Sequence, residues 1–459
     1  MVTRWRIFVW LFAATGVVRS LQIHEWIWDR DPLGALMLLA GLALALRPDS
    51  ARLFVAVVGV RLALFASRMP DVHNQEMIET QMLLGVLAVW WFARPTNDEE
   101  RFAAVAPVIR AGLVAVYAIA VFQKLNVDFF DPEVGCAATL WRSSVERWGM
   151  PAAWGGLGWA ATVGTLAVET GLPVLLVLRR TRAAGLLLAM AFHWWLAADM
   201  GVYAFSAMMF AWLATLTPKA WLSAWNLSRS APIALATCAG ATGAAAAIAV
   251  WFTAGARLGV LGWVWWLLLG IVVTAAAGVA AWRSRGALPE AAFAPGVLRG
   301  PALTTAVLLV ITASSPYLGL KTMTTLGMYS NLGTEGDRWN HLLVPPGMKL
   351  FGYQDDLLVL TGSNNPKLAA AAQAGGLLPR FEVRRQLRLQ SGPVWAEYLD
   401  GERAFRFERD GKTLVDPQRL LDGGSWWLEK TLHFNLVDAG DRQSCRFDRP
   451  ILQSRAPHR

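Results

Sequence analysis

The chain has 459 residues, of which 55% are hydrophobic and only 16% charged, with a formal net charge of +9. A soluble chain would carry roughly a quarter charged residues, so the composition excludes an ordinary soluble globular protein. The three cysteines, Cys136, Cys238 and Cys445, are too few for a disulfide-dense scaffold or a four-cysteine metal site. Because most cations lie between apolar runs, the positive charge does not indicate a nucleic-acid partner.

Apolar runs of the length of a membrane span recur from the N-terminus to residue 320. In chain order the predicted spans are 5–23, 32–46, 51–67, 75–93, 103–124, 152–178, 183–199, 202–217, 231–254, 258–282 and 302–320. No small-residue cleavage site follows the first span, so we expect a retained anchor and not a cleaved signal peptide.

The charges between the spans predict the orientation of the chain. If the N-terminus is inside, the inner loops carry fourteen lysines and arginines. The outer loops then carry five, which are Arg30, Arg68, Arg142, Arg147 and Arg257. This asymmetry follows the positive-inside rule, and an odd number of spans places the C-terminus outside. We therefore expect an integral protein of a bacterial cytoplasmic (inner) membrane, surrounded by lipid, with an extracytoplasmic C-terminus.

The predicted fold is an all-α polytopic membrane bundle over residues 1–320, followed by a small extracytoplasmic α+β cap domain over residues 321–459. Residues 381–389 alternate apolar and polar side chains, which is typical of a half-buried strand. Residues 404–415 carry Asp-Gly between two short strands, which is typical of a hairpin. Residues 367–374 read as a short helix with a glycine stop.

Lys124 stands at the end of the fifth predicted span. An ammonium at that depth needs water, an acidic partner or a lowered pKa. One interpretation is a functional lysine; the other is a long side chain that simply reaches the interface. Asp128 lies four residues further on and would pair with Lys124 if the helix continued. A close carboxylate would oppose the action of Lys124 as a base, so we expect Asp128 to point away from the lysine or to face water.

Other polar residues mark the outer half of the bundle. His193 lies near the outer end of the seventh span, Glu169 inside the sixth, and His73 with Asn74 in the turn before the fourth. Together with Lys124 they would supply a base, an acid and hydrogen-bond partners if they converge on one cavity. Structural interpretations remain open: an interhelical hydrogen bond for His193, satisfaction by Arg61 or a backbone donor for Glu169, and an ordinary polar turn at His73. The spans carry no His-x-x-x-His or Glu-x-x-His pair, so no metal is predicted.

Four segments together resemble the horizontally transferred transmembrane domain family, which includes the vitamin K-dependent γ-carboxylases. They are Tyr117–Asp128, in which Lys124 is followed by Leu-Asn-Val-Asp, then Val168–Pro173, Phe192–Phe205 and Tyr329–Leu343. The similarity covers roughly residues 1–345. Two departures limit it: the family has Asn-Asn-His where this chain has His73-Asn74, and its carboxylases carry a much larger luminal portion. Carboxylation of glutamate therefore does not follow from the resemblance.

The resemblance implies a membrane enzyme that couples oxidation of a reduced quinone, a vitamin K-like hydroquinone, to proton abstraction from a substrate at the outer membrane face. Lys124 would be the base, with His193 and Glu169 orienting the reactants. The predicted contacts to substrate or quinone are His73, Asn74, Asn126, Asn340 and His341. The substrate would be a secreted peptide or protein.

The alternative is a non-catalytic membrane factor that holds a secreted peptide against the cap during maturation or export. Its polar groups would then form a site for a peptide or a lipid headgroup. A transporter would require broken helices in related halves of the chain, and the sequence shows no such pairing.

Two cysteines fall on the predicted oxidising side. A disulfide between Cys136 and Cys445 would clamp the cap to the membrane domain, whereas two unpaired thiols on the same side are the alternative. Cys238 lies within a predicted span and is expected to stay reduced.

Overall fold

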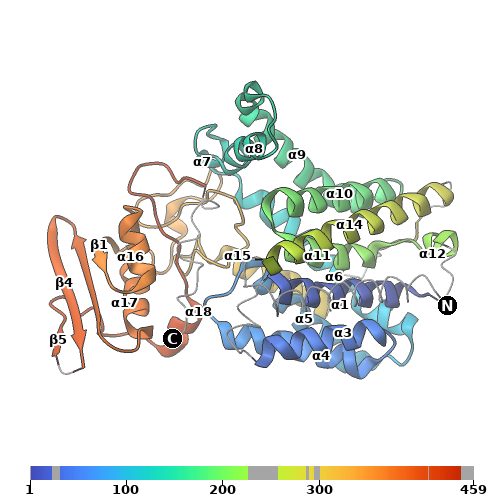
Figure 1. The fold of residues 1–459 in the computed structure, drawn as a ribbon, viewed down its shortest axis with the longest axis horizontal. Helices are drawn as coiled ribbons and strands as arrows, with labels where there is room; N and C mark the ends of the chain where they lie inside the picture. Colours follow the sequence, from blue (N-terminus) through green and yellow to red (C-terminus); the bar gives the residue numbers. More distant parts are fainter. Residues whose placement is uncertain are drawn as a thin grey trace. The chain divides into compact units, whose positions relative to one another are not determined.

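The computed structural model describes residues 2–22, 32–225, 257–285, 289–293, 300–411 and 413–445. This part of the chain is mostly helical, with a small antiparallel sheet near the C-terminus (Figure 1). The chain forms two compact units, each assembled from separate stretches of sequence. The first unit comprises residues 1–67, 78–117 and 170–309, and the second comprises 68–77, 118–169 and 310–459. The domain boundary at residue 320 stays a prediction.

The apolar runs form helices wherever the structure describes them. These helices are α1 (Arg4–Gln22), α3 (Pro32–Leu46), α4 (Ala51–Arg68), α5 (Asn74–Ala93), α6 (Asp98–Gln123), η1 (Ala152–Leu157) with α9 (Gly158–Val177), α10 (Arg182–Met200), α11 (Tyr203–Leu213) with η2 (Ala214–Leu216), α14 (Arg257–Arg283) and α15 (Pro301–Ser314). The short α12 (Lys219–Trp225) follows η2. The helical prediction is confirmed for these segments, and the predicted span 231–254 lies outside the described residues.

Four stretches of the described chain are helical, long and apolar enough to cross a membrane: Asp98–Gln123, Ala152–Val177, Arg182–Met200 and Trp263–Arg283. Three shorter apolar helical stretches are Pro32–Leu46, Tyr203–Leu216 and Pro301–Ser314. A span needs about 20 predominantly apolar residues, so these lengths and compositions fit a membrane protein.

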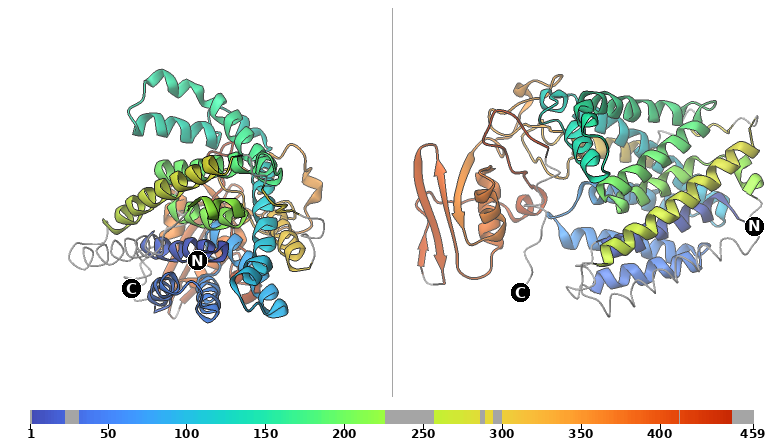
Figure 2. Two further views of the ribbon diagram at one scale, coloured as in Figure 1. Left: turned by 90° about the vertical axis from the view of Figure 1, so that its right-hand side faces the viewer. Right: turned by 45° about the horizontal axis from the view of Figure 1, so that its top comes forward.

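The first unit is a bundle of apolar helices. Within it α1, α3, α10, α11 and α14 pack side by side (Figure 2). Every residue of α11 is buried, as expected for a helix that is apolar on all sides. Around the start of α1, an aromatic cluster joins Trp5, Phe8, Phe12, Phe54 and Trp90.

The second unit contains short helices and the sheet. The helices α7 (Val127–Phe130) and α8 (Cys136–Arg147) follow α6, and η3 (Pro346–Met348) lies in the long irregular segment after α15. The sheet has the order β2-β1-β3-β4-β5, with antiparallel neighbours throughout. Its strands are β1 (Leu357–Ser363), β2 (Leu377–Pro379), β3 (Val394–Asp400), β4 (Arg403–Asp410) and β5 (Thr413–Val415).

Three helices accompany the sheet: α16 (Pro366–Gln373), α17 (Arg380–Leu389) and α18 (Trp426–Thr431). Leu368 of α16 and Val383 of α17 pack with Leu358, Ala396 and Phe407 from the strands, which makes one apolar core between helices and sheet. Figure 1 shows α16 and α17 beside the strands. The mixed helix and sheet composition predicted near the C-terminus is thus present, and we call this sheet with α16, α17 and α18 the cap; its extracytoplasmic position stays a prediction.

Two local predictions for the cap are confirmed. The helix over 367–374 is α16, and Asn365 caps it by accepting backbone hydrogen bonds from the first turn. Gly375 follows the helix with a φ of +62°, a conformation that glycine adopts without steric penalty. The predicted hairpin is also present, because β4 and β5 pair in antiparallel register from Asp410 and Thr413 onwards.

The strand predicted over residues 381–389 is wrong, because these residues form α17. The helix brings Glu382 onto one face with Arg385 and Gln386, three and four residues later, and both donate hydrogen bonds to its carboxylate. All three polar side chains are buried, as are Phe381 and Val383. The alternating pattern therefore described a helix buried on several sides, and the richness in glutamate, arginine, glutamine and leucine was the missed helical signal.

Candidate functional site

Lys124 lies in the second unit, at the point where α6 ends. The preceding side chain, Gln123, is fully buried and donates a hydrogen bond to the Ala313 carbonyl oxygen at 3.0 Å. Asn126 Nδ2 donates to the Gln123 carbonyl oxygen at 2.9 Å, and Asn126 Oδ1 accepts from the Phe129 backbone at 2.9 Å, which caps α7. These contacts stop α6 and hold the turn that carries Lys124.

Lys124 and Glu169 form a buried ion pair. Lys124 Nζ lies 2.8 Å from Glu169 Oε2 and donates to Oε1 at 3.1 Å. The lysine and glutamate side chains are only 5% and 13% exposed, so Lys124 does not reach out to solvent. The structure thus brings together two of the predicted catalytic residues. Because each charge compensates the other, removal of either would leave a buried charge unpaired.

Asp128 has other partners. Its Oδ2 atom accepts hydrogen bonds from Asn340 Nδ2 at 2.7 Å and from the Gln443 backbone at 3.0 Å. Asp128 belongs to α7, because α6 has already ended at Gln123, so the helical spacing that would pair it with Lys124 does not exist. The Asp128 carboxylate joins α7 to the C-terminal tail.

Asn126, Asn340 and His341 use their polar atoms within the chain. Asn340 Oδ1 accepts a hydrogen bond from the Gly333 backbone at 2.8 Å. His341 Nδ1 accepts from backbone N–H groups, and His341 Nε2 lies 3.0 Å from the Phe122 carbonyl oxygen. The ring proton therefore sits on Nε2 and is donated to the end of α6, and burial lowers the His341 pKa. A direct role in binding quinone or substrate stays a prediction for all three.

The irregular segment between α15 and β1 has a strained backbone at several residues. Residues 321–335 contain no helix or strand, yet nearly all of them are buried. Four of its non-glycine residues have φ angles between 53° and 67°: Thr324, Leu326, Tyr329 and Asn331. Such conformations persist only where surrounding contacts hold them, and they gather at functional sites. One of these contacts comes from Asn126, whose side chain donates to a carbonyl oxygen of this segment.

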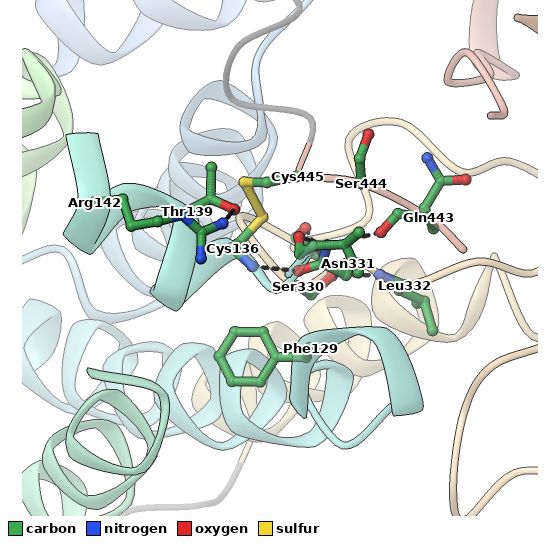
Figure 3. The surroundings of a disulfide bond; sticks show 12 residues. Phe129, Cys136, Thr139, Arg142, Ser330, Asn331, Leu332, Gln443, Ser444 and Cys445 are labelled. Carbon is green, nitrogen blue, oxygen red and sulfur yellow. Dashed lines mark hydrogen bonds between the residues drawn. A yellow bond between two sulfur atoms is a disulfide. The ribbon is translucent and has the colours of Figure 1, made fainter. Parts of the chain in front are cut away.

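A disulfide joins Cys136, the first residue of α8, to Cys445 in the C-terminal tail (Figure 3). The disulfide considered from the sequence is therefore present, and the two Cα atoms lie 4.7 Å apart. Asn331 lies beside it: its Oδ1 accepts from the Cys136 backbone at 2.7 Å, and its Nδ2 donates to the Gln443 carbonyl oxygen at 2.9 Å. The tail is thus bound both covalently and by hydrogen bonds. Cys238 lies outside the described residues.

His193 lies in the first unit, on α10. Its Nε2 atom is 2.7 Å from the Tyr117 hydroxyl oxygen on α6, and its Nδ1 atom has no hydrogen-bond partner among the residues described. This contact is the interhelical hydrogen bond of the structural interpretation. Because the Lys124–Glu169 pair belongs to the second unit, the convergence of all three residues stays a prediction.

The first unit also holds a buried charge cluster that the sequence analysis missed. Glu79 on α5 forms ion pairs with Arg19 on α1 and Arg61 on α4. Arg61 also donates to the Phe12 carbonyl oxygen at 2.6 Å. Arg61, considered above as a partner for Glu169, is thus engaged by Glu79. The available signal was two charged residues inside each of the predicted spans 5–23, 51–67 and 75–93.

His73 and Asn74 lie in the second unit, where His73 precedes α5 and Asn74 is its first residue. The His73 backbone donates to Glu76 Oε2 at 2.7 Å, which is half of a capping box, and Asn74 Oδ1 accepts from the Leu326 backbone at 2.9 Å. The His73 side chain is 46% exposed. These contacts agree with the interpretation as an ordinary polar turn.

Asp71, in the same turn, belongs to a buried ionic cluster with the cap that the sequence analysis also missed. Lys367 Nζ donates to Asp71 Oδ1 at 2.9 Å, and Arg385 Nη2 lies 3.6 Å from the same atom. His433 Nε2 lies 3.7 Å from Asp71 and 3.8 Å from Glu382. Burial lowers the pKa of His433 to about 4. Burial opposes ionisation of Asp71, but nearby positive charges outweigh it and hold the Asp71 pKa well below its usual range.

A buried lysine, Lys321, is a further residue that the sequence analysis passed over. It follows the last apolar run, and its Nζ donates to Thr324 Oγ1 at 3.1 Å. Burial lowers the Lys321 pKa to about 8. The signal in the sequence was a lysine placed directly after a predicted span, as at Lys124.

Fold and contacts together define a class: a mostly helical chain with membrane-length apolar helices, a buried lysine–glutamate pair and a small antiparallel cap. No known protein family, curated protein or solved structure matches the chain. In the described ranges, no group of three or more His, Cys, Asp or Glu side chains is placed to hold a metal ion.

Proposed function

We propose that the chain is an integral membrane enzyme that takes a proton from a reduced quinone, as the resemblance to the vitamin K-dependent carboxylase family implies. The observation that supports this most is the buried Lys124–Glu169 pair, whose nearest atoms are 2.8 Å apart, at the end of a membrane-length helix. Apolar residues would stabilise such a position as well as an ion pair does. Function is therefore the better reason for a buried amine and carboxylate here.

The pair suits a weakly acidic hydroxyl group. Lys124 can accept a proton at Nζ only when its amine is neutral, and Glu169 is within hydrogen-bond distance to take the lysine proton. Transfer from Nζ to the carboxylate would turn the ion pair into a neutral amine and a carboxylic acid with no change in net charge. Lys124 would then remove the hydroxyl proton of the bound quinol, and Glu169 would hold the displaced proton. The quinol itself supplies the reducing electrons and, with oxygen, a base strong enough to attack a carbon acid.

The outer membrane face is the proposed place of reaction. The cation asymmetry of the loops supports a bacterial inner membrane with the tail outside. A secreted peptide or protein would be the carbon acid and would meet the cap there. Because Asn126, Asn340 and His341 already bond within the chain, recognition of the quinol hydroxyl falls mainly to Lys124 and Glu169.

A non-catalytic role in maturation or export of a secreted peptide is the second candidate. It is favoured by β5, an edge strand that is exposed along its length and hydrogen-bonded only to β4 in the described sheet. Such an edge can bind an extended peptide through backbone hydrogen bonds.

The test uses the full chain in lipid nanodiscs, supplied with vitamin K hydroquinone or menaquinol and then with oxygen. Consumption of the quinol is followed by absorbance. Lys124→Ala should lower the rate by about 10² to 10⁴-fold, the usual contribution of a general base. Lys124→Arg should fail equally, because guanidinium does not deprotonate. Lys219→Ala, which removes an exposed lysine paired with Glu99, is the control and should keep the wild-type rate.

Wild-type rates in both Lys124 variants would exclude the lysine as the base. Binding of an extended peptide to β5 by a wild-type protein that consumes no quinol would favour the non-catalytic function.

A further inference from the structure

Residues 342–351, Leu-Leu-Val-Pro-Pro-Gly-Met-Lys-Leu-Phe, form an apolar loop in the second unit. Leu342, Leu343, Met348, Leu350 and Phe351 each expose between 44% and 73% of their surface. Single exposed apolar residues are common, but five within ten residues make a continuous apolar surface that calls for a partner. We call residues 342–351 the apolar loop.

The only charge of the apolar loop is turned inward. The Lys349 side chain is 14% exposed and forms an ion pair with Asp355. Its Nζ atom also donates to the Gly336 carbonyl oxygen at 3.0 Å. A loop built to face water would do the opposite, with its charge in solvent and its leucines covered. The outward surface of the loop is therefore uncharged as well as apolar.

Both ends of the apolar loop are tied to the ends of apolar helices. Leu342 N–H donates to the carbonyl oxygen of Leu125, two residues after α6 ends, at 2.9 Å. Leu350 and Phe351 donate to the carbonyl oxygen of Leu318, four residues after α15 ends, at 3.2 and 3.0 Å. Because α6 is long enough to span a membrane, the end of α6 would lie at the membrane–water interface. These hydrogen bonds therefore hold the apolar loop at the same level.

An aromatic platform keeps the apolar loop in place. The Tyr317 ring packs edge-on against Trp339 and His341, with centroids 6.1 and 5.0 Å apart. Trp339 Nε1 donates to the Val344 carbonyl oxygen at 2.5 Å, directly before two prolines. Tyrosine and tryptophan are the residues enriched where a membrane protein crosses the headgroup region. The exposure of the leucines is thus built into an ordered loop.

We propose that the apolar loop inserts into the lipid leaflet at which α6 ends, with the acyl chains of the bilayer as its partner. Bonding of Leu342 to Leu125 puts the inserted loop next to Lys124, so an apolar ligand from the bilayer would reach the lysine past this loop. The inference rests on the membrane placement in the proposed function and is independent of the quinol chemistry.

The test places an environment-sensitive NBD fluorophore on single cysteines in the Cys238→Ser protein, with the Cys136–Cys445 disulfide left oxidised. Labels at Leu343→Cys, Met348→Cys and Leu350→Cys are measured in phosphatidylcholine vesicles. Nitroxide-labelled lipids should quench them at least several-fold more than aqueous iodide does, and their emission should shift to the blue.

Two matched controls have similar exposure. Leu414→Cys, at a residue 58% exposed on β5 of the cap, should be quenched by iodide. Leu268→Cys, at a residue 61% exposed on the membrane-length part of α14, should be quenched by the lipid nitroxide.

Quenching of the loop labels by iodide, together with lipid quenching at Leu268→Cys, would overturn the inserted loop and leave the membrane placement intact. Protection of the loop labels from both quenchers would indicate a protein partner or a second copy and would also overturn it. Iodide quenching at Leu268→Cys as well would refute the membrane placement on which the proposed function depends.

Discussion

Removing one partner of the Lys124–Glu169 pair should destabilise the protein more than removing both. At 2.8 Å and an effective dielectric constant of about 20, the attraction between the two charges is on the order of 6 kcal/mol, before the desolvation that offsets it. Breaking a buried pair on one side costs about 3 to 5 kcal/mol, because the remaining charge is left unpaired. We expect this loss for Lys124→Met and for Glu169→Met. The double variant should be within about 1 kcal/mol of the wild type or more stable.

The assay is unfolding by SDS titration in mixed micelles at pH 7, followed by the fluorescence of the 24 tryptophans. The four proteins form a double-mutant cycle, and the coupling free energy should be at least about 3 kcal/mol. A buried ion pair at this position would be refuted if each single variant lost less than about 1 kcal/mol of unfolding free energy and the double variant lost the sum of the two.

Three further predictions concern other parts of the molecule. Acidification should destabilise the cap, because burial lowers the pKa of His433 from its usual 6.5 to about 4 in the folded chain. Neutral His433 therefore favours the folded state above pH 6.5, and this stabilisation, about 3 kcal/mol, is lost as the pH falls towards 4. Hydrogen exchange of the cap should show this loss, and His433→Gln should remove that part of the profile; an unchanged profile would speak against it. Non-reducing peptide mapping should recover the Cys136–Cys445 peptide, and reduction should destabilise the chain by about 2 to 5 kcal/mol, the usual cost of removing a native disulfide; free, alkylatable thiols at both positions would contradict this. A reporter fused to the C-terminus should be accessible from outside, since the inner loops carry most of the cations, and a cytoplasmic signal would reverse the orientation.

The helices were predictable because a long apolar run can adopt few structures other than a helix. Burial of backbone N–H and C=O groups in an apolar setting requires internal hydrogen bonds, so every described run became a helix. The cap helix α16 and the β4–β5 hairpin were also predictable from short stretches of sequence. Asn365 and Gly375 mark the two ends of the helix, and Asp410 with Gly411 marks the turn of the hairpin. Prediction from short sequence patterns was correct where residues close in sequence determine the secondary structure.

Residues 381–389 show where local rules fail. Period-two alternation and a helix with buried polar residues place apolar side chains at some of the same positions. Helix-favouring residues in this segment argue for the helix, and its buried polar side chains find partners far away in the sequence: Asp71 lies beside Arg385, and His433 lies beside Glu382.

The sequence predicts which residues could belong to the candidate site, but it does not predict which of them contact each other. Lys124 and Glu169 were both recognisable as charges in apolar runs, yet 45 residues and an unknown helix register separate them. Asp128 points away from Lys124, as expected, and bonds to Asn340 and Gln443. The helix α6 ends at Gln123, whose side chain donates to the carbonyl oxygens of Ala313 and Thr325. Sequence spacing describes a continuing helix and cannot report where tertiary contacts end it.

The most direct test of a quinol site at Lys124 is a lipid extract of the protein purified from native membranes in mild detergent. Mass spectrometry should find about one quinone per chain in the wild type and in Lys219→Ala, and markedly less in Lys124→Ala. A wild-type quinone content no higher than that of an unrelated membrane protein purified in the same way would contradict the proposed site.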